Sequence, residues 1–255
     1  MSQVQISSFI NLEFICCYYL TSQPTTMKNQ VKSCLLAITI IFSAVPCICQ
    51  VDVGADFVSR YLWRGQLLAN GPSIQPSISF TKGSFEIGAW GSYGLASGFD
   101  GTEADIYATF SVGPVSATLT DYFFPSDRSG VDFDNYFEYD KDLTGHVLEV
   151  MLSYEVDDFP LSIDVAYDFY GADHDNSFYI GLGYSISDQT ELFVEGGNGW
   201  YSFESSGDDS FGLVSIGLTH TKEIKFSETF SLPIFGTIAI NPDGEKLFLV
   251  FGISF

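Results

Sequence analysis

Acidic side chains recur at even-numbered spacings in parts of this chain, and that spacing decides what chemistry they could do. In the segment 161–170, Asp164 and Asp168 alternate with Leu161, Ile163 and similar apolar residues. Successive side chains of a β-strand point to opposite faces, so the two carboxylates share one face and the apolar side chains share the other. Such a carboxylate face could attract and conduct cations, or it could be neutralised by basic partners.

The same parity, applied to the other alternating segments, gives a set of candidate interior residues. Among them, Arg60 and Arg64 would lie close together and face a row of carboxylates. The electric field between the two sets of charges would orient polar solutes. The alternative is that these charges pair with one another and simply fill the interior as a plug. Glycines on the same face have no side chain to fill the interior and therefore favour an open lumen; they are Gly181, Gly183, Gly197, Gly217 and Gly252. The candidates are Asp56, Arg60, Arg64, Glu86, Asp105, Glu149, Asp164, Asp168, Glu191, Glu195 and Lys246.

Composition excludes several classes of protein. The chain has 255 residues, 32 of them acidic and 10 basic, with a formal net charge of -22. Aromatic residues equal charged residues at 16% each, which is far too apolar for a disordered chain. Nucleic-acid binding requires a basic footprint that this chain lacks, so no nucleic-acid partner is expected.

The first fifty residues form a separate unit. Lys28 and Lys32 precede an apolar run from Leu35 to Val45, the pattern of a secretory signal peptide. The run is too short for a membrane-spanning helix, which needs about 20 residues. We therefore expect an upstream extension or mis-assigned start over 1–26, a cleaved signal peptide over 27–50, and one mature domain over 51–255. All five cysteines precede residue 50, which excludes disulfides and thiolate metal sites from that domain.

From residue 51 onward, a period of two replaces any helical pattern. Alternation predicts about twelve strands, most of them near the roughly 9–11 residues that a tilted strand needs to cross a bilayer. The predicted segments are 53–62, 73–81, 85–94, 103–112, 115–123, 146–156, 161–170, 177–186, 191–198, 211–220, 230–240 and 246–255.

The connections between these segments alternate in length. Short turns such as 82–84 and 113–114 alternate with longer connections until the last pair, where 221–229 is long and 241–245 is short. Transmembrane barrels have short periplasmic turns and longer external loops. Aromatic residues near strand ends suit interfacial girdles, namely Tyr61, Trp63, Tyr93, Phe123, Phe124, Tyr170, Trp200 and Tyr201. The fold class expected is all-β, a transmembrane antiparallel up-and-down β-barrel; a secreted β-sandwich or a soluble barrel is the alternative.

The segment 53–93 carries three short motifs, V-S-x-Y-x-[FW]-R-G in the first predicted strand, G-P at the start of the second and G-x-[WF] in the third. The residues that form them are Val58, Ser59, Tyr61, Trp63, Arg64, Gly65, Gly71, Pro72, Gly88 and Trp90. With these motifs the segment resembles a little-characterised family of bacterial outer-membrane porins. The resemblance implies an outer-membrane barrel of Gram-negative bacteria, surrounded by lipid, without a defined substrate or cofactor. Arg60 departs from the Asp or Asn expected at its position and adds a second cation.

The longest loop, 124–145, is strongly acidic. Asp132, Asp134 and Glu138 could ligate Ca²⁺ through oxygen, although no EF-hand spacing is present. A solvated acidic loop, or one folded inward to restrict a channel, is the alternative interpretation.

The function expected is a narrow diffusion channel for small polar or cationic solutes. A closed structural or adhesive barrel that acts through its acidic loops is the first alternative. An outer-membrane hydrolase is the second, but Ser153 shares the strand of His146 and points the other way, and no G-x-S-x-G motif occurs. The chain is therefore not expected to be an enzyme.

Overall fold

The computed structural model describes residues 50–95, 101–125, 127–128, 131–132, 135–202, 210–228 and 230–255. They belong to one compact unit, Cys49–Phe255. The expected extension over 1–26 and signal peptide over 27–50 lie outside the described residues except for Gln50, so both stay predictions.

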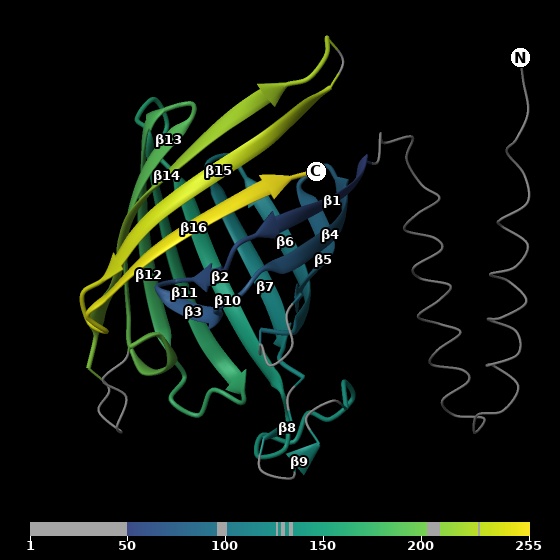
Figure 1. Ribbon diagram of the computed structural model, residues 1–255. Coiled ribbons are helices and arrows are strands. Elements are labelled where there is room, and N and C mark those ends of the chain that lie inside the picture. Colours follow the sequence, from purple (N-terminus) through teal and green to yellow (C-terminus); the bar gives the residue numbers. More distant parts are fainter. Residues whose placement is uncertain are drawn as a thin grey trace, which may run out of the picture. The chain divides into compact units, whose positions relative to one another are not determined.

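Twelve antiparallel strands close into a barrel (Figure 1). Each strand pairs with the next barrel strand along the chain, and the last pairs with the first, which is up-and-down topology. The strands are β1 (Gln50–Val58), β4 (Ser73–Lys82), β5 (Phe85–Gly94), β6 (Glu103–Val112), β7 (Val115–Phe123), β10 (His146–Glu155), β11 (Leu161–Gly171), β12 (Phe178–Ser187), β13 (Thr190–Gly197), β14 (Gly212–Lys225), β15 (Ser231–Asn241) and β16 (Lys246–Ser254). The predicted all-β barrel of about twelve strands is confirmed.

Two predicted boundaries are wrong. The first strand ends at Val58 rather than at residue 62, and Tyr61–Trp63 belongs to a separate hairpin. β14 continues to Lys225, so the predicted loop 221–229 shrinks to 226–230, a hairpin tip that projects from one end of the barrel (Figure 1). Strand pairing with β15 continues through Lys225↔Ser231, which is why the polar residues before it remain in the sheet.

The apolar face of the strands points outward. Leu247 and Phe251 on β16 are 66% and 57% exposed, whereas Glu149 on β10 is fully buried. Val165 and Ile180 are register partners on the outward face of β11 and β12. An exposed apolar belt of this extent needs a hydrocarbon environment, and a closed barrel leaves no unpaired strand edge in it. The barrel is therefore a transmembrane one, and the soluble alternatives fail; within the described residues, no helix is long and apolar enough to span a membrane.

Aromatic rings occupy the space next to the inward-facing glycines. A Cβ atom on Gly217 would lie 2.2 Å from the ring of Phe193, and one on Gly252 would lie 2.1 Å from the ring of Phe235. At Gly181 and Gly197, Tyr179 and Tyr201 fill the space in the same way, and Glu191 and Ser162 do so at Gly183. The interpretation of these glycines as leftover space is wrong, because each makes room for a neighbouring side chain.

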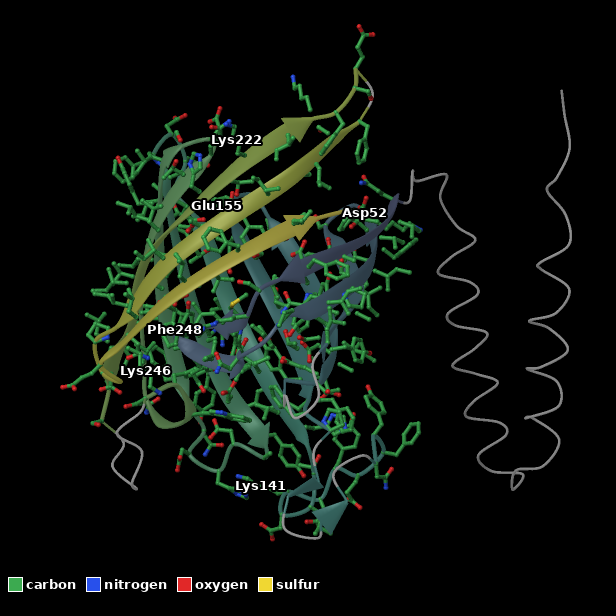
Figure 2. All side chains as sticks on the ribbon, viewed as in Figure 1. Asp52, Lys141, Glu155, Lys222, Lys246 and Phe248 are labelled. Atoms are coloured by element: carbon green, nitrogen blue, oxygen red, sulfur yellow. The ribbon has the colours of Figure 1, made fainter. Side chains whose placement is uncertain are left out.

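Figure 2 shows how the charged side chains are distributed. Glu155 and Lys222 lie toward the end of the barrel that carries the short turns, and Lys141 and Lys246 lie toward the end that carries the longer connections. The longer connections are 59–72, 95–102, 124–145, 172–177 and 198–211. The first and the last of these, 59–72 and 198–211, contribute side chains to the interior, and they build the candidate site.

Candidate functional site: a charged constriction inside the barrel

The connection between β1 and β4 forms a small hairpin of β2 (Tyr61–Trp63) and β3 (Gln66–Ala69), called the inward hairpin below. Its turn consists of Arg64 and Gly65, with φ angles of 45° and 75°. Positive φ at both central residues is the requirement of the type I′ turn that suits two-residue hairpins. Arginine is an unusual residue at such a position, and strain of this kind persists only where the surroundings fix it.

The tip of the inward hairpin is fixed to the barrel wall at β14 and β15. The Asn241 side-chain amide on β15 donates to the carbonyl oxygen of Gly65 at 3.0 Å, and the Gln66 amide donates to the carbonyl of Trp200 at 2.8 Å. A Cβ atom on Gly65 would lie 2.0 Å from the carbonyl oxygen of Val214 on β14. The hairpin therefore leaves β1 and β4 and projects into the lumen as far as the inner faces of β14 and β15, and only glycine fits its tip.

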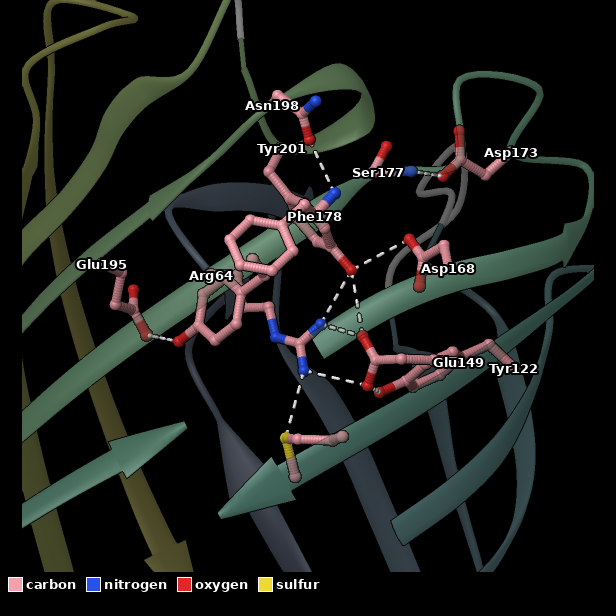
Figure 3. A network of polar contacts seen from close by, with 12 residues as sticks. Arg64, Tyr122, Glu149, Asp168, Asp173, Ser177, Phe178, Glu195, Asn198 and Tyr201 are labelled. Carbon is pink, nitrogen blue, oxygen red and sulfur yellow. Dashed lines mark hydrogen bonds and ion pairs between the residues drawn. The ribbon is translucent and has the colours of Figure 1, made fainter. Parts of the chain in front are cut away.

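Arg64 forms the centre of a buried polar network (Figure 3). Its guanidinium makes a two-pronged ion pair with Glu149 on β10, with Nη1 bonded to Oε2 and Nη2 3.0 Å from Oε1. It also stacks on aromatic rings, with Cζ 4.1 Å from the ring centroid of Tyr179 and 4.6 Å from that of Trp63. Planar stacking combined with bidentate pairing is a use for which lysine could not substitute.

A second connection adds Tyr201, from the short 3₁₀ helix η1 (Gly199–Tyr201) between β13 and β14. The Tyr201 hydroxyl accepts from Arg64 Nη1 at 2.7 Å and lies 3.1 Å from Oε2 of Glu149 and 3.0 Å from Oδ2 of Asp168. Burial, more than the neighbouring charges, holds the pKa of Tyr201 well above its ordinary value, so the hydroxyl keeps its proton.

Carboxylates outnumber cations in this network. Glu149 is satisfied by Arg64, Tyr122 and Tyr201, whereas Oδ1 of the adjacent, buried Asp168 has no hydrogen-bond partner among the described residues. Glu195 joins through Tyr179, whose hydroxyl donates to it at 2.8 Å. One arginine thus faces three acidic side chains in this network.

The predicted interior residues separate into three groups. Arg64 meets Glu149, Asp168 and Glu195 in the network above. Four other candidates lie on the inward face away from this network. Glu86 accepts hydrogen bonds from Thr81 and Tyr107, and Asp164 accepts one from Ser153. Asp105 accepts a hydrogen bond from the Phe123 backbone, and Asp56 is the register partner of Gln75. Among the described residues, the last three candidates make no contact with the Arg64 network. Arg60 is half-buried beside the inward hairpin, and Glu191 and Lys246 are exposed near the starts of β13 and β16.

The motif residues fold differently from the expected first strand. Val58 ends β1, and the Ser59 side chain accepts from the Phe251 backbone. Tyr61, Trp63, Arg64 and Gly65 build the inward hairpin, and the ring centroid of Tyr61 lies 5.5 Å from that of Trp90 on β5. Gly71 and Pro72 lead into β4, where the Ser73 hydroxyl bonds the Gly71 carbonyl. The motif therefore encodes the constriction more than a membrane strand.

The predicted aromatic girdle is partly wrong for the same reason. Tyr61, Trp63 and Tyr201 lie in the lumen, because the connections that carry them fold inward. The rings of Phe124 and Trp200 pack against each other at a tilt beside this network, with 5.5 Å between their centroids. Tyr93 remains exposed on the outward face of β5, as a girdle residue should.

His146 lies on the outward side of the barrel under part of the 124–145 loop, which we call the strap (residues 135–145). Its Nδ1 is 2.6 Å from Oδ1 of Asp121, and its Nε2 is 2.8 Å from the Tyr136 carbonyl oxygen. The Tyr139 ring stacks on the imidazole at 4.2 Å. Both ring nitrogens face acceptors, so the ring holds the strap and presents no base to a nucleophile; Ser153 points into the lumen, as expected.

Several members of the network were not among the candidates predicted from the sequence. Tyr122 on β7 and Tyr179 on β12 lie on the inward face that alternation assigns to them, but they carry no charge. Tyr201 belongs to a connection that folds inward. Asn198 followed by Gly199 (φ 54°) is the one local signal of a turn that would redirect Tyr201. Of the loop acids considered for Ca²⁺, the Asp132 and Asp134 side chains lie outside what the structure describes, and Glu138 accepts from the Asp140 backbone.

Comparison with known proteins adds only distant similarity. No family model matches the chain, and no curated protein matches it. Among solved structures, the chain is similar to the KdgM porin over 79% of its length and 96% of that protein, with 9% identity and a TM-score of 0.41. It is also similar to an engineered variant of the Rhodopseudomonas blastica porin over 82% and 99% of the two chains, with 11% identity and a TM-score of 0.35. At such identities no residue-by-residue correspondence exists, so the chemistry of the site follows from this chain's own side chains.

Proposed function

We propose that the protein is a narrow, cation-preferring diffusion channel of the outer membrane of a Gram-negative bacterium. The observation that carries the proposal is the charged constriction, in which the inward hairpin presents Arg64 to an excess of carboxylates inside a lipid-facing barrel. The expected signal peptide over 27–50 and the short turns at one end suit insertion from the periplasm. The solutes would be small and polar.

The lumen beyond the constriction supports a water-filled path. Inward polar side chains in the half of the barrel with the short turns stay partly exposed, which a solidly packed interior would prevent; they include Glu86, Thr109, Thr118, Asp164, Thr219 and Thr237. Barrels of eight strands are filled by side chains and those of sixteen leave a channel, so a twelve-stranded barrel with one inserted hairpin suits a narrow pore.

Conductance in planar bilayers tests the proposal. Refolded protein should give small ohmic steps, and a salt gradient should give a zero-current potential of the sign of a cation-selective pore. Glu86→Gln combined with Asp164→Asn should reduce that potential while the steps remain, because both acids lie beyond the constriction. Steps without selectivity would contradict the role of the carboxylates.

A closed structural or adhesive barrel is the second candidate. The complete burial of Glu149 and the near-complete burial of Tyr201 favour it, since a sealed network would stop solute. In that case refolded protein with heat-modifiable mobility on SDS gels would insert into bilayers without any conductance. Hydrolysis has less support, because the nitrogen of His146 that a nucleophile would need is bonded to the Tyr136 carbonyl. Ca²⁺ binding by the acidic 124–145 loop stays a separate proposal.

A further inference from the structure

A second acidic cluster lies beside the inward hairpin, apart from the Arg64 network. Glu103 and Asp105 are two residues apart on β6, so their side chains leave the same, inward face. Glu103 is 1% exposed and Asp105 is 6% exposed. Their register partners on β5 are Ser92 and Trp90, and the Tyr61 ring of the hairpin packs on Trp90.

The Glu103 carboxylate is buried without a well-formed hydrogen bond. Neither of its oxygens has a partner of normal hydrogen-bond geometry among the described residues, and its polar neighbours are the Tyr61 hydroxyl and the Asp105 carboxyl group. No ion pair joins Glu103 or Asp105 to a basic side chain of the described residues, since Arg64 pairs with Glu149. Burial of a carboxylate without an opposite charge is strongly unfavourable, so two adjacent ones require either protons or a cation.

We propose that Glu103 and Asp105 bind a hard, oxygen-seeking cation of the Ca²⁺ class between the inward hairpin and the barrel wall. The two carboxylates would be the charged ligands. Neutral oxygen is close at hand in the Tyr61 hydroxyl, the Ser92 hydroxyl and the amide of Gln75, which already bonds Ser92 at 3.5 Å. Water would complete the six to eight ligands that Ca²⁺ accepts in flexible geometry.

The donor set decides the class of ion. The cluster offers no imidazole or thiolate, so zinc and copper are disfavoured. No group of three or more acidic, His or Cys side chains in metal-binding geometry occurs among the described residues, so affinity rests on two charges. A dissociation constant of roughly 10⁻⁴–10⁻³ M, as in extracellular calcium modules, is the expected range. The bound ion would hold the Tyr61 side of the hairpin while Arg64 holds its tip.

Terbium luminescence tests this inference independently of channel activity. Tb³⁺ replaces Ca²⁺ at oxygen sites, and Trp90, the register partner of Asp105, is placed to sensitise its emission. Refolded wild-type protein should give saturable emission that Ca²⁺ displaces. Glu103→Gln should weaken Tb³⁺ binding by at least about tenfold, because it removes one of two charged ligands. Trp90→Phe should abolish the emission while Ca²⁺ still raises the temperature at which the barrel loses its folded gel mobility.

The matched control is Glu86→Gln, which removes an inward carboxylate whose two oxygens are already bonded by Thr81 and Tyr107. It should leave Tb³⁺ binding unchanged. The proposal is overturned if folded wild-type protein shows neither emission nor Ca²⁺-dependent stabilisation, which would mean that Glu103 and Asp105 share a proton instead. Emission that survives in Glu103→Gln also overturns it and assigns the ion to the acidic loop. Should Glu103→Gln fail to fold, Asp105→Asn and removal of Ca²⁺ from the wild-type protein by a chelator test the same site.

Discussion

Arg64 at the turn of the inward hairpin forms a two-pronged ion pair with Glu149 on β10, across the lumen of the barrel. The pair joins a connection to a membrane strand, so a charge interaction decides where the hairpin lies. Because both groups are buried, neither can be removed alone without leaving the other in a poor environment.

Replacing Arg64 by Ala should destabilise the barrel and widen the channel through it. The uncompensated Glu149 should lower the free energy of unfolding by about 3–5 kcal/mol, measured by urea titration in lipid vesicles. Single-channel steps should become larger and more cation-selective, because the hairpin loses its hold and the lumen loses a positive charge. Arg60→Ala is the matched control, with the same change in charge in the same connection, and should change both quantities much less. Equal effects of the two variants would contradict the role given to Arg64.

The pair should show strong coupling in a double-mutant cycle. Glu149→Leu alone leaves a buried arginine, and Arg64→Met alone leaves a buried glutamate, whereas the double variant leaves neither. We expect the double variant to lose less stability than either single variant, with a coupling energy of about 2 kcal/mol or more. Additive losses, measured by the same urea titration, would show that the two residues act separately.

Gly65→Ala should be far more disruptive than a matched glycine substitution. At Gly65 the new methyl group would collide with the Val214 carbonyl at 2.0 Å, whereas at Gly83, with a similar positive φ, nothing lies within 4 Å. Gly83→Ala should cost about 1 kcal/mol from backbone strain alone. Gly65→Ala should lower the free energy of unfolding clearly more than that, and it should enlarge the conductance, because the hairpin tip could no longer pack against β14. A similar loss of stability at both positions would show that the hairpin tip is not tightly packed against β14.

The strap should depend on His146. His146→Ala removes the bond between the ring and the Tyr136 carbonyl of the strap, and with it the ring on which Tyr139 stacks; the bond to Asp121 on β7, which orients the ring, is lost as well. Cleavage by trypsin after Lys141 should therefore become faster in vesicle-embedded protein, while the barrel keeps its heat-modifiable mobility. His220→Ala, at the opposite end of the barrel where the ring bonds Thr190, should leave the cleavage rate unchanged. A rate unaffected by His146→Ala would mean that other contacts hold the strap.

Alternation was sufficient to predict the strands and the direction of their faces. Leu247, Phe251 and Asp168 lie where a period of two places them, because the pleat and the closed ladder leave each side chain only two directions. The inward location of Arg64 was predicted correctly, although the reason was wrong. Its parity was counted along a strand that actually ends at Val58.

Connections carry no such periodicity, and most of the errors lie there. Trp63 and Tyr201 look like girdle residues in the sequence, since only the folded hairpin and η1 reveal that they face Arg64. The prediction of open space beside the inward glycines failed for a similar reason. The ring that fills the space beside Gly217 comes from Phe193 on the neighbouring strand. Cross-strand packing of this kind depends on register, which no single segment encodes.

Excision of the inward hairpin tests the central claim most directly. Val58 and Ser73 are register partners on β1 and β4, so residues 59–72 can be replaced by a two-residue Asn-Gly turn that keeps the barrel ladder intact. Single-channel recording should show small steps for the wild-type protein and much larger ones for the excised variant, with both proteins folded by gel mobility. Equal steps, or none from either folded barrel, would contradict a channel whose size is set by this hairpin.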